Sequence, residues 1–128
     1  MSVIAIAKGV RISPRKVSVV ASLVRGRSVA DALTILEHTP RNSATPVVKA
    51  IKSAQANADH NHNYKPDTLR ITEISVTPGP RSKRFRPVSR GMAHPYQKRT
   101  SHIRVVVDGE QRAAKKASTA KVVTKEEK

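Results

Sequence analysis

The chain has 128 residues, which is enough for one domain with little left over. Lys and Arg number 25 against 9 Asp and Glu, and the formal net charge of +16 favours nucleic acid as the partner. Cysteine is absent, which excludes disulfides, thiolate zinc sites and a cysteine nucleophile. The apolar stretch from Val3 to Ala7 is too short for a signal segment or a membrane span, so we expect no membrane partner.

Only three aromatic residues occur, and they are spread along the chain at Tyr64, Phe85 and Tyr96. Proteins that grip single strands usually stack bases on several aromatic faces. We therefore expect this chain to contact phosphate, sugar and the shape of a nucleic-acid helix. The core must be aliphatic and small, so we expect a bound partner to add stability.

The first predicted elements are a strand and a helix. Residues 2–8 are partly β-branched and are followed by Gly9, which favours a short strand that ends there. Ser13 and Pro14 form the pattern of an N-cap followed by proline at the first helical position, and Gly26 ends the helix. Apolar residues recur at helical spacing at Val17, Val20, Ala21 and Val24.

Two more helices are predicted after the first. Ser28 followed by Asp31 three residues later is an Asp variant of the capping box at the start of the second helix. The third helix begins after Ser43 or Asn42. The expected core positions are Val29, Ala32, Leu33 and Leu36 in the second helix and Val47, Ile51, Ala54 and Ala58 in the third.

The second half of the chain contains two clear strand patterns, at residues 69–76 and 102–108. In the first of them the apolar alternation slips between Ile71 and Ile74, which indicates a bulge or a switch of face.

The connection between these strands carries the strongest functional signal. Residues 74–107 contain no Asp or Glu. The connection spans about 21 residues from Gly79 to Arg99, whereas an ordinary hairpin loop needs about 2–5. Its positive residues are Arg81, Lys83, Arg84, Arg86, Arg90, Lys98 and Arg99, and Arg104 follows in the second strand. Two interpretations are open, a disordered basic loop that lies on a surface or an extended hairpin that leaves the domain.

The extended hairpin is the favoured interpretation because Gly91 stands near the middle of the segment, where it could form the turn. Ten residues per arm would reach about 33 Å at about 3.3 Å per residue. An isolated two-stranded arm is only marginally stable in water. A strongly positive arm is therefore expected to be ordered inside folded nucleic acid.

The pattern of elements predicts a single RNA-binding domain over residues 1–109, with the hairpin extension at about 79–99. Residues 110–128 are rich in Ala, Lys and Glu with few large apolar groups, so we expect a charged, disordered tail.

Catalytic and metal chemistry are poorly supported by the sequence. His60 and His62 could bind a metal on an exposed turn, but only Asp59 stands nearby at ligand spacing, so a solvated loop is favoured. Walker-type phosphate loops and nucleophile elbows are absent. We expect no enzyme activity, no catalytic residues, no metal and no cofactor.

Several blocks, taken together and in order, resemble the bacterial large-subunit ribosomal protein twenty-two family. The blocks are Arg11-x-Ser13-Pro14-Arg15-Lys16-Val17, Val24-Arg25-Gly26-Arg27, Ala32-Leu33-x-Ile35-Leu36, Lys52-Ser53-Ala54-x-Ala56-Asn57-Ala58 and Lys98-Arg99-Thr100-Ser101-His102-Ile103. They cover residues 5–108. The sequence departs from the family pattern near the middle of the hairpin, where Val88 and Met92 stand at positions that are commonly Arg.

This resemblance implies an α+β fold with three helices packed on a small three-stranded antiparallel sheet and a long protruding β-hairpin. It implies a structural role in the cytoplasmic ribosome, with binding to 23S rRNA, contact with neighbouring large-subunit ribosomal proteins and assistance in subunit assembly. It further implies that the hairpin lines the tunnel through which the nascent polypeptide leaves. A homo-oligomer is not expected.

Charge and resemblance together select two groups of candidate residues. Those expected to bind rRNA are Arg11, Arg15, Lys16, Arg25, Arg27, Lys52, Arg81, Lys83, Arg84, Arg86, Arg90, Lys98, Arg99 and His102. Those expected to form the tunnel-lining tip are Val88, Ser89, Arg90, Gly91, Met92 and Ala93.

Two alternatives belong to other functional classes. An architectural DNA-binding protein with a basic β-arm would share the charge and the arm. Such proteins typically dimerise through a large apolar face, whereas each helix here has only a narrow apolar stripe. An enzyme that acts on RNA would require turnover that disappears when a His or an acidic residue is changed.

Overall fold

The centre of the domain is a three-stranded antiparallel sheet in the order β1-β5-β2. The structure, a computed structural model, describes residues 2–112. Its strands are β1 (Val3–Val10), β2 (Arg70–Pro78), β3 (Ser82–Pro87), β4 (Ala93–Lys98) and β5 (Ser101–Asp108), and its helices are α1 (Pro14–Val24), α2 (Val29–Glu37) and α3 (Ala44–His62), with 3-10 turns η1 (Pro66–Thr68) and η2 (Ser89–Gly91). The predicted α+β class with three helices is confirmed.

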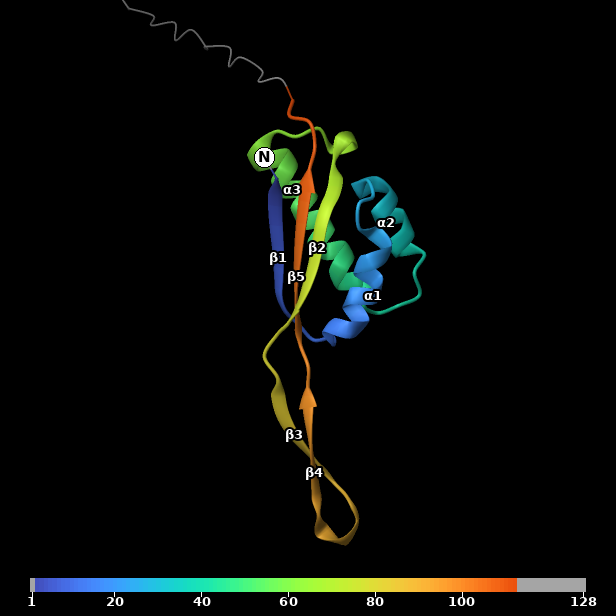
Figure 1. The fold of residues 1–128 in the computed structure, drawn as a ribbon, viewed down its shortest axis with the longest axis vertical. Helices are drawn as coiled ribbons and strands as arrows, with labels where there is room; N and C mark the ends of the chain where they lie inside the picture. The colour runs from blue at the N-terminus through green and yellow to red at the C-terminus, as the bar shows by residue number, and fades with distance from the viewer. Residues whose placement is uncertain (1, 113–128) are drawn as a thin grey trace, which may run out of the picture.

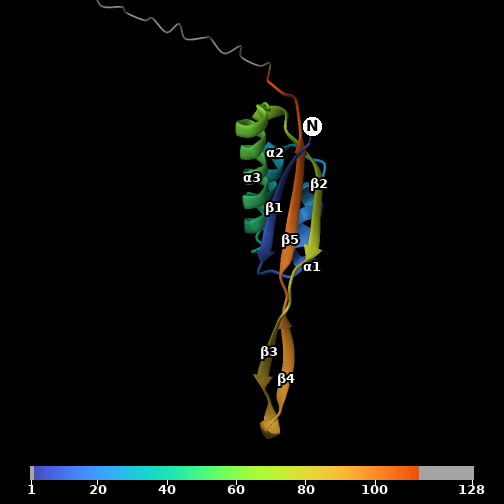
Figure 2. The ribbon, with the colours of Figure 1, turned by 90° about the vertical axis from the view of Figure 1, so that its left-hand side faces the viewer.

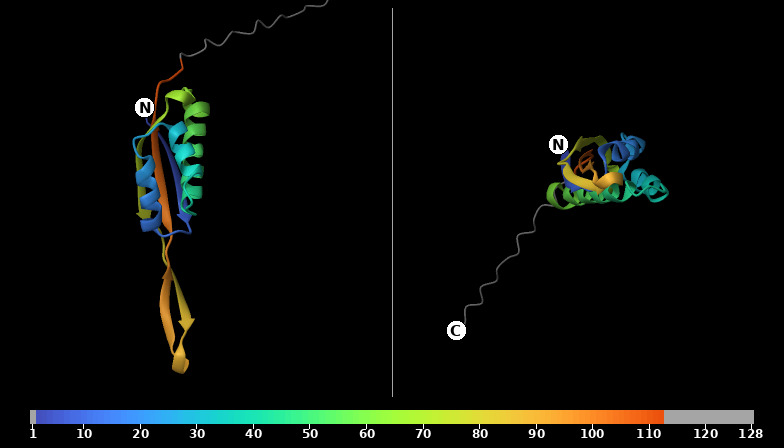
Figure 3. Two further views of the ribbon diagram at one scale, coloured as in Figure 1. Left: turned by 90° about the vertical axis from the view of Figure 1, so that its right-hand side faces the viewer. Right: turned by 90° about the horizontal axis from the view of Figure 1, so that it is seen from below.

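The helices cover one face of the sheet and leave the other face open. Figure 2 shows the three strands in front with the helices behind them, and the left view of Figure 3, from the opposite side, shows the helices toward the viewer. Alternate β5 residues Ile103, Val105 and Val107 are fully buried, as expected for side chains on the covered face. The predicted helix positions are also buried, namely Val17, Val20, Ala21, Val24, Val29, Ala32, Leu36, Val47, Ile51, Ala54 and Ala58, and only Leu33 is partly exposed.

The helix starts follow the capping patterns in the sequence to different degrees. The capping box of α2 is confirmed, because the Asp31 N–H donates to Ser28 Oγ at 3.2 Å and the Ser28 hydroxyl donates to Asp31 Oδ2 at 2.7 Å. Ser13 is the N-cap residue of α1 and Ser43, not Asn42, is that of α3. Neither of these two serine side chains makes a capping hydrogen bond.

Two irregularities shape the sheet. The expected bulge in β2 is confirmed, since its register against β5 shifts between Ile71 and Glu73. In β1 the strand does not end at Gly9 as expected but continues to Val10 through a second register shift. Gly9 lies at φ 70° there, a conformation that glycine adopts without a steric penalty, so the chain kinks and pairing resumes.

The basic segment forms the long hairpin and not a disordered surface loop. Figure 1 shows β2 and β5 leading out of the sheet into the ribbon of β3 and β4, which protrudes from the domain. At its tip Arg90 and Gly91 both have positive φ, 60° and 68°. The Val88 N–H donates to the Met92 carbonyl at 2.9 Å and closes the turn. Gly91 thus lies in the turn, as predicted.

The opposite end of the domain holds the last described residues. The Lys65 N–H donates to the Glu110 carbonyl at 3.0 Å, and the Arg112 N–H donates to the Asn63 carbonyl at 2.7 Å. Arg112 also forms an ion pair with Asp59 at 3.1 Å. Residues 110–112, assigned to the tail in the sequence analysis, therefore contact the domain, and the rest of the expected disordered tail lies outside the described residues.

Candidate nucleic-acid interface

Acidic residues are absent from the hairpin and gather mainly at the opposite end of the molecule. Residues 2–30, 38–58 and 74–107 contain no acid, and they include the hairpin and the starts of α1 and α3 at the end of the domain from which it emerges. Of the seven acids in residues 2–112, Asp59, Asp67, Asp108 and Glu110 lie at the end of α3, in η1 and around the end of β5, at the opposite end (Figure 1), whereas Asp31 and Glu37 lie in α2 and Glu73 in β2. An approaching polyanion is therefore attracted to the hairpin end.

The hairpin has two chemically different faces, because directly paired residues of β3 and β4 share a face. One face carries the pairs Ser82 with Lys98, Arg84 with Tyr96 and Arg86 with His94. The other carries Lys83 with Gln97, Phe85 with Pro95 and Pro87 with Ala93. The first face is cationic and the second is largely apolar.

On the cationic face, Arg86 and Tyr96 form a cation–π pair. The Arg86 Cζ lies 5.4 Å from the centroid of the Tyr96 ring, and the two residues are diagonal neighbours across the ribbon. The ring fixes the orientation of the guanidinium on an otherwise exposed strand. This pairing restricts the conformations available to Arg86 before RNA or DNA arrives.

On the apolar face, Phe85 is 73% exposed and Met92 near the tip is 59% exposed. A hollow of about 580 Å³ on the ribbon draws on both faces, since its lining includes Phe85 and Pro95 together with Arg84 and Tyr96. Large apolar groups on an exposed ribbon lose contact with water only when a partner covers them.

At the root of the hairpin, the domain contributes a further cation. Arg11 lines a hollow of about 470 Å³ together with Ser82, Lys98, Arg99 and Thr100. The root itself is fixed by two hydrogen bonds, from the Gly79 N–H to the Thr100 carbonyl at 2.8 Å and from the Thr100 hydroxyl to the Pro80 carbonyl at 2.7 Å. Arg11, Lys98 and Arg99, distant in sequence, thus meet at one point.

The remaining predicted residues lie on the domain with different surroundings. Arg25 donates from Nη2 to the Ile74 carbonyl at 3.0 Å, and Arg27 donates from Nε to the Leu23 carbonyl at 3.0 Å. The first bond holds Arg25 against β2 and the second holds Arg27 against the end of α1, and each guanidinium has further N–H groups for a phosphate. Every predicted Arg and Lys side chain is exposed.

His102 lies beside the hairpin root, near Gly79, whereas Lys52 lies away from it. His102 is partly buried, and its Nδ1 accepts the Gly9 N–H at 3.0 Å, so it joins β5 to the kinked end of β1. Lys52 lies on α3, where it lines a hollow of about 520 Å³ with Lys49, Arg41 and the acidic Glu37. The structure does not place Lys52 beside the hairpin.

Sequence reasoning did not select three residues that the structure adds to the candidate interface. Arg41 stands just before α3, beside the start of α1, and Arg104 lies on the open face of the sheet. Tyr96 is the third, through its contact with Arg86. A signal for Arg41 was present, since it precedes a helix start in a segment without acids.

Within residues 2–112 no group of three or more His, Asp or Glu side chains is arranged to hold a metal ion. The helices of this same part of the chain are also too short or too polar to cross a bilayer.

These features define a small, strongly basic α+β domain that extends one cationic two-stranded arm. Comparison of sequences then gives the family: the chain belongs to the family Ribosomal protein L22p/L17e, whose model matches residues 5–108. The relatives compared with it below are each named "Large ribosomal subunit protein uL22". The chain is 52% identical over 103 residues to the proteins of Desulfitobacterium hafniense (strain DSM 10664 / DCB-2) and Clostridium novyi (strain NT), which covers 80% of this chain and 90% and 93% of theirs. It is 50% identical over 106 residues to that of Lacticaseibacillus casei (strain BL23), with 83% and 91% covered. The family resemblance found in the sequence is confirmed.

Proposed function

We propose that this chain is a structural component of the large ribosomal subunit in the cytoplasm, where it binds 23S rRNA and supports subunit assembly. The observation that carries the proposal is the acid-free hairpin together with the acid-free end of the domain. Family membership supports it further, because the relatives are named as proteins of the large ribosomal subunit. The protein acts by binding, with no catalytic step.

The arm provides the mechanism of binding. Arg84 and Arg86 project from one face of the ribbon, and Arg99 with Arg11 extends the positive charge to its root. Each cation that contacts a phosphate releases condensed counterions, which favours association. A narrow ribbon can enter between RNA helices, and contacts on both of its faces then order it.

The tip has a different proposed role. Val88, Met92 and Ala93 surround the turn at Gly91. Arg90 is the one charged residue among residues 88–93. We propose that this tip lines the passage through which the nascent polypeptide leaves, while neighbouring ribosomal proteins contact the domain.

Competition binding separates this function from an architectural DNA-binding role. A labelled 23S rRNA is bound to the full chain and challenged with unlabelled rRNA or with duplex DNA of equal phosphate concentration. We expect rRNA to compete far better, and we expect the free protein to be monomeric by analytical ultracentrifugation. Equal competition by DNA and a stable dimer would favour the architectural alternative.

A further inference from the structure

His102 connects two parts of the molecule that are far apart in the sequence. It lies at the start of β5, directly after the hairpin root, on the open face of the sheet that also carries Arg104. Its Nδ1 accepts the N–H of Gly9 at 3.0 Å, although 93 residues separate the two. Gly9 lies in the kink of β1, where the register against β5 shifts between Ala7 and Val10. A side chain, and not the strand ladder, therefore holds the chain at the kink.

The same imidazole packs against the root of the hairpin. A Cβ atom at Gly79 would lie 3.2 Å from Cε1 of His102 and 2.5 Å from Oγ1 of Thr100, so only glycine leaves these two side chains their room. Figure 1 shows that the end of β1 lies beside the point where β2 and β5 leave the sheet. His102 thus contacts the end of β1 on one side and the hairpin root on the other.

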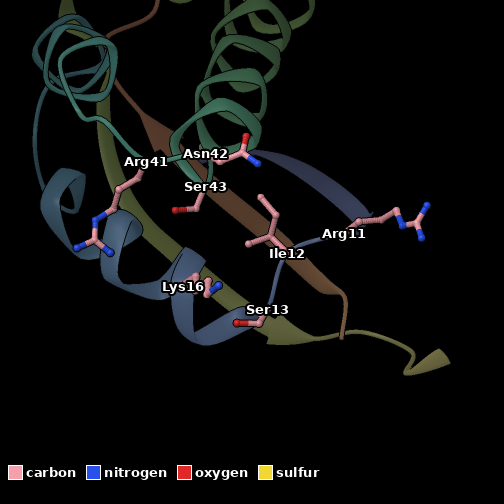
Figure 4. Close-up of a pocket in the computed structure, with 7 residues that line it drawn as sticks. All are labelled: Arg11, Ile12, Ser13, Lys16, Arg41, Asn42 and Ser43. Carbon is pink, nitrogen blue, oxygen red and sulfur yellow. The ribbon is translucent and has the colours of Figure 1, made fainter. Parts of the chain in front are cut away.

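The segment after the kink carries Arg11 to the hairpin root. Val10 pairs with Ser101 of β5, and Arg11 follows it and lines the hollow at the root. Figure 4 shows the guanidinium of Arg11 pointing away from the other labelled side chains, which lie around the starts of α1 and α3. The place of Arg11 therefore depends on the path that the chain takes at Gly9.

The hydrogen bond from Gly9 requires one protonation state of His102. An imidazole nitrogen accepts a hydrogen bond only when it carries no proton, so the ring must be neutral with its proton on Nε2. Protonation of Nδ1 turns the acceptor into a donor that faces the Gly9 N–H. Histidine changes charge between about pH 5 and pH 8, so the bond is expected to be present at the upper end of this range and to be lost as the pH falls.

No carboxylate is placed to become a new partner of a protonated ring. The charged groups that the neighbouring elements bring to the surroundings of His102 are all cations, namely Lys8 of β1, Arg11 after the kink, Arg104 of β5, and Lys98 and Arg99 at the hairpin root. On β2 the residue opposite His102 is Thr77, which does not titrate. Glu73 of β2 pairs with Val106, four residues further along β5. Within residues 2–112, the Gly9 bond is therefore lost on protonation without a replacement.

We propose that His102 is a proton-sensitive latch between the end of β1 and the root of the hairpin. With a neutral ring it holds the kink at Gly9 and so positions Arg11 at the root. When the ring takes up a proton from solvent, the bond is lost and the segment from Gly9 to Arg11 is released from β5. His102 thus acts inside the chain as a positioning residue, whether or not RNA is bound.

A pH titration of the free, isotope-labelled full chain by NMR tests the latch. At about pH 8 the ring nitrogens of His102 should show a proton on Nε2 and none on Nδ1. As the pH falls to about 5, the amide signals of Gly9, Arg11 and Gly79 should shift with the same midpoint as the ring. A proton on Nδ1 of the neutral ring, or a Gly9 amide that does not follow the ring, would overturn the proposal.

Two variants of His102 separate the acceptor from the ring. His102→Asn offers an amide oxygen near the place of Nδ1 that does not titrate, so the Gly9 amide should keep its high-pH position throughout. His102→Phe keeps a ring without an acceptor, so the Gly9 amide proton should exchange about 5- to 10-fold faster at high pH and lose its pH response. His94→Asn changes an exposed histidine of β4 and is the matched control. A wild-type pH response in His102→Asn, or loss of the response in His94→Asn, would contradict the latch.

Thermal unfolding of each variant checks that it is folded. If His102→Phe does not fold, the titration of the unaltered chain and of His102→Asn still decides the outcome. Because the readout needs no RNA, the latch and the proposed function fail separately. Absence of the Gly9 response in a chain that binds 23S rRNA would overturn the latch alone.

Discussion

Ser101 places a hydroxyl group in the core, where the sheet narrows into the hairpin. The residue is fully buried, and its Oγ has no partner within residues 2–112. Because an unpaired buried hydroxyl costs about 1–3 kcal/mol, we expect Ser101→Ala to leave the free energy of unfolding unchanged or to raise it by about 1 kcal/mol. Urea denaturation measures this, with the exposed Ser22→Ala as the control. A clear loss of stability in Ser101→Ala would show that the hydroxyl has a partner.

Ala54 is a core residue whose small side chain matters for the packing of α3. It is fully buried in α3, the helix that packs against β1 and β5, whereas Ala56 on the same helix is exposed. Ala54→Leu should overpack this face and destabilise the fold by about 1–3 kcal/mol. Ala56→Leu adds the same side chain to the exposed face and should have little effect. Equal thermal stability of the two variants would contradict the packing.

The sequence predicts the burial or capping role of some single residues and not of others. Val17, Val20 and Val24 could be placed in the core because aliphatic spacing alone selects one helix face. The choice between Asn42 and Ser43 at the start of α3 could not be made, because both are good N-cap residues. The unpaired hydroxyl of Ser101 depends on packing between distant segments, which no local pattern records.

Among the elements, the proposed function assigns separate roles to two parts of the hairpin. Arg84 and Arg86 lie on the shaft of the ribbon, whereas Val88 and Met92 flank the turn. Changing both arginines to Glu replaces attraction to phosphate by repulsion and should impair incorporation into subunits. Val88→Trp or Met92→Trp keeps the charge of the shaft, so incorporation should persist. Because a larger tip would narrow the passage for the nascent chain, these variants should instead change the arrest of translation by some nascent peptides.

Subunit occupancy and translation-arrest profiles of both kinds of variant check this division. Arg84→Gln with Arg86→Gln serves as the milder control, because it removes charge without adding repulsion. Normal incorporation of the Glu variant together with failure of the Trp variants would reverse the assignment of roles.

The elements also show where a sequence pattern is sufficient. The capping box of α2 and the slip in β2 are local features, and both appear at the expected residues. The continuation of β1 past Gly9 could not be predicted, because it depends on pairing of Val10 with Ser101. The cation–π pair in the arm likewise depends on the register set by the turn, which the position of Gly91 alone does not fix.

At the scale of the whole molecule, the separation of charge predicts a steep dependence of RNA affinity on salt. If about four charges on the arm and about four on the domain each contact a phosphate, the log–log slope should be about −6 to −7. Filter binding to 23S rRNA over a range of potassium chloride concentrations measures this slope. A slope near −1 would remove the electrostatic mechanism.

The whole-molecule arrangement was only partly predictable. The net charge and the acid-free segment 74–107 are properties of the sequence, and they indicated a polyanionic partner and an arm. The meeting of Arg11 with Lys98 and Arg99 at the hairpin root required the tertiary structure. So did the hydrogen bond between Gly9 and His102, because 93 residues separate them in the sequence.

Co-sedimentation with the large ribosomal subunit tests the proposed function most directly. The tagged full chain is expressed in the cells that naturally encode it. Ribosomal subunits are then separated on sucrose gradients after a high-salt wash that removes loosely bound proteins. We predict that the chain remains with the large subunit in near-equal amount to its rRNA, and that the double change of Arg84 and Arg86 to Glu releases it. Recovery of the unaltered chain only at the top of the gradient, or with DNA, would contradict the proposal.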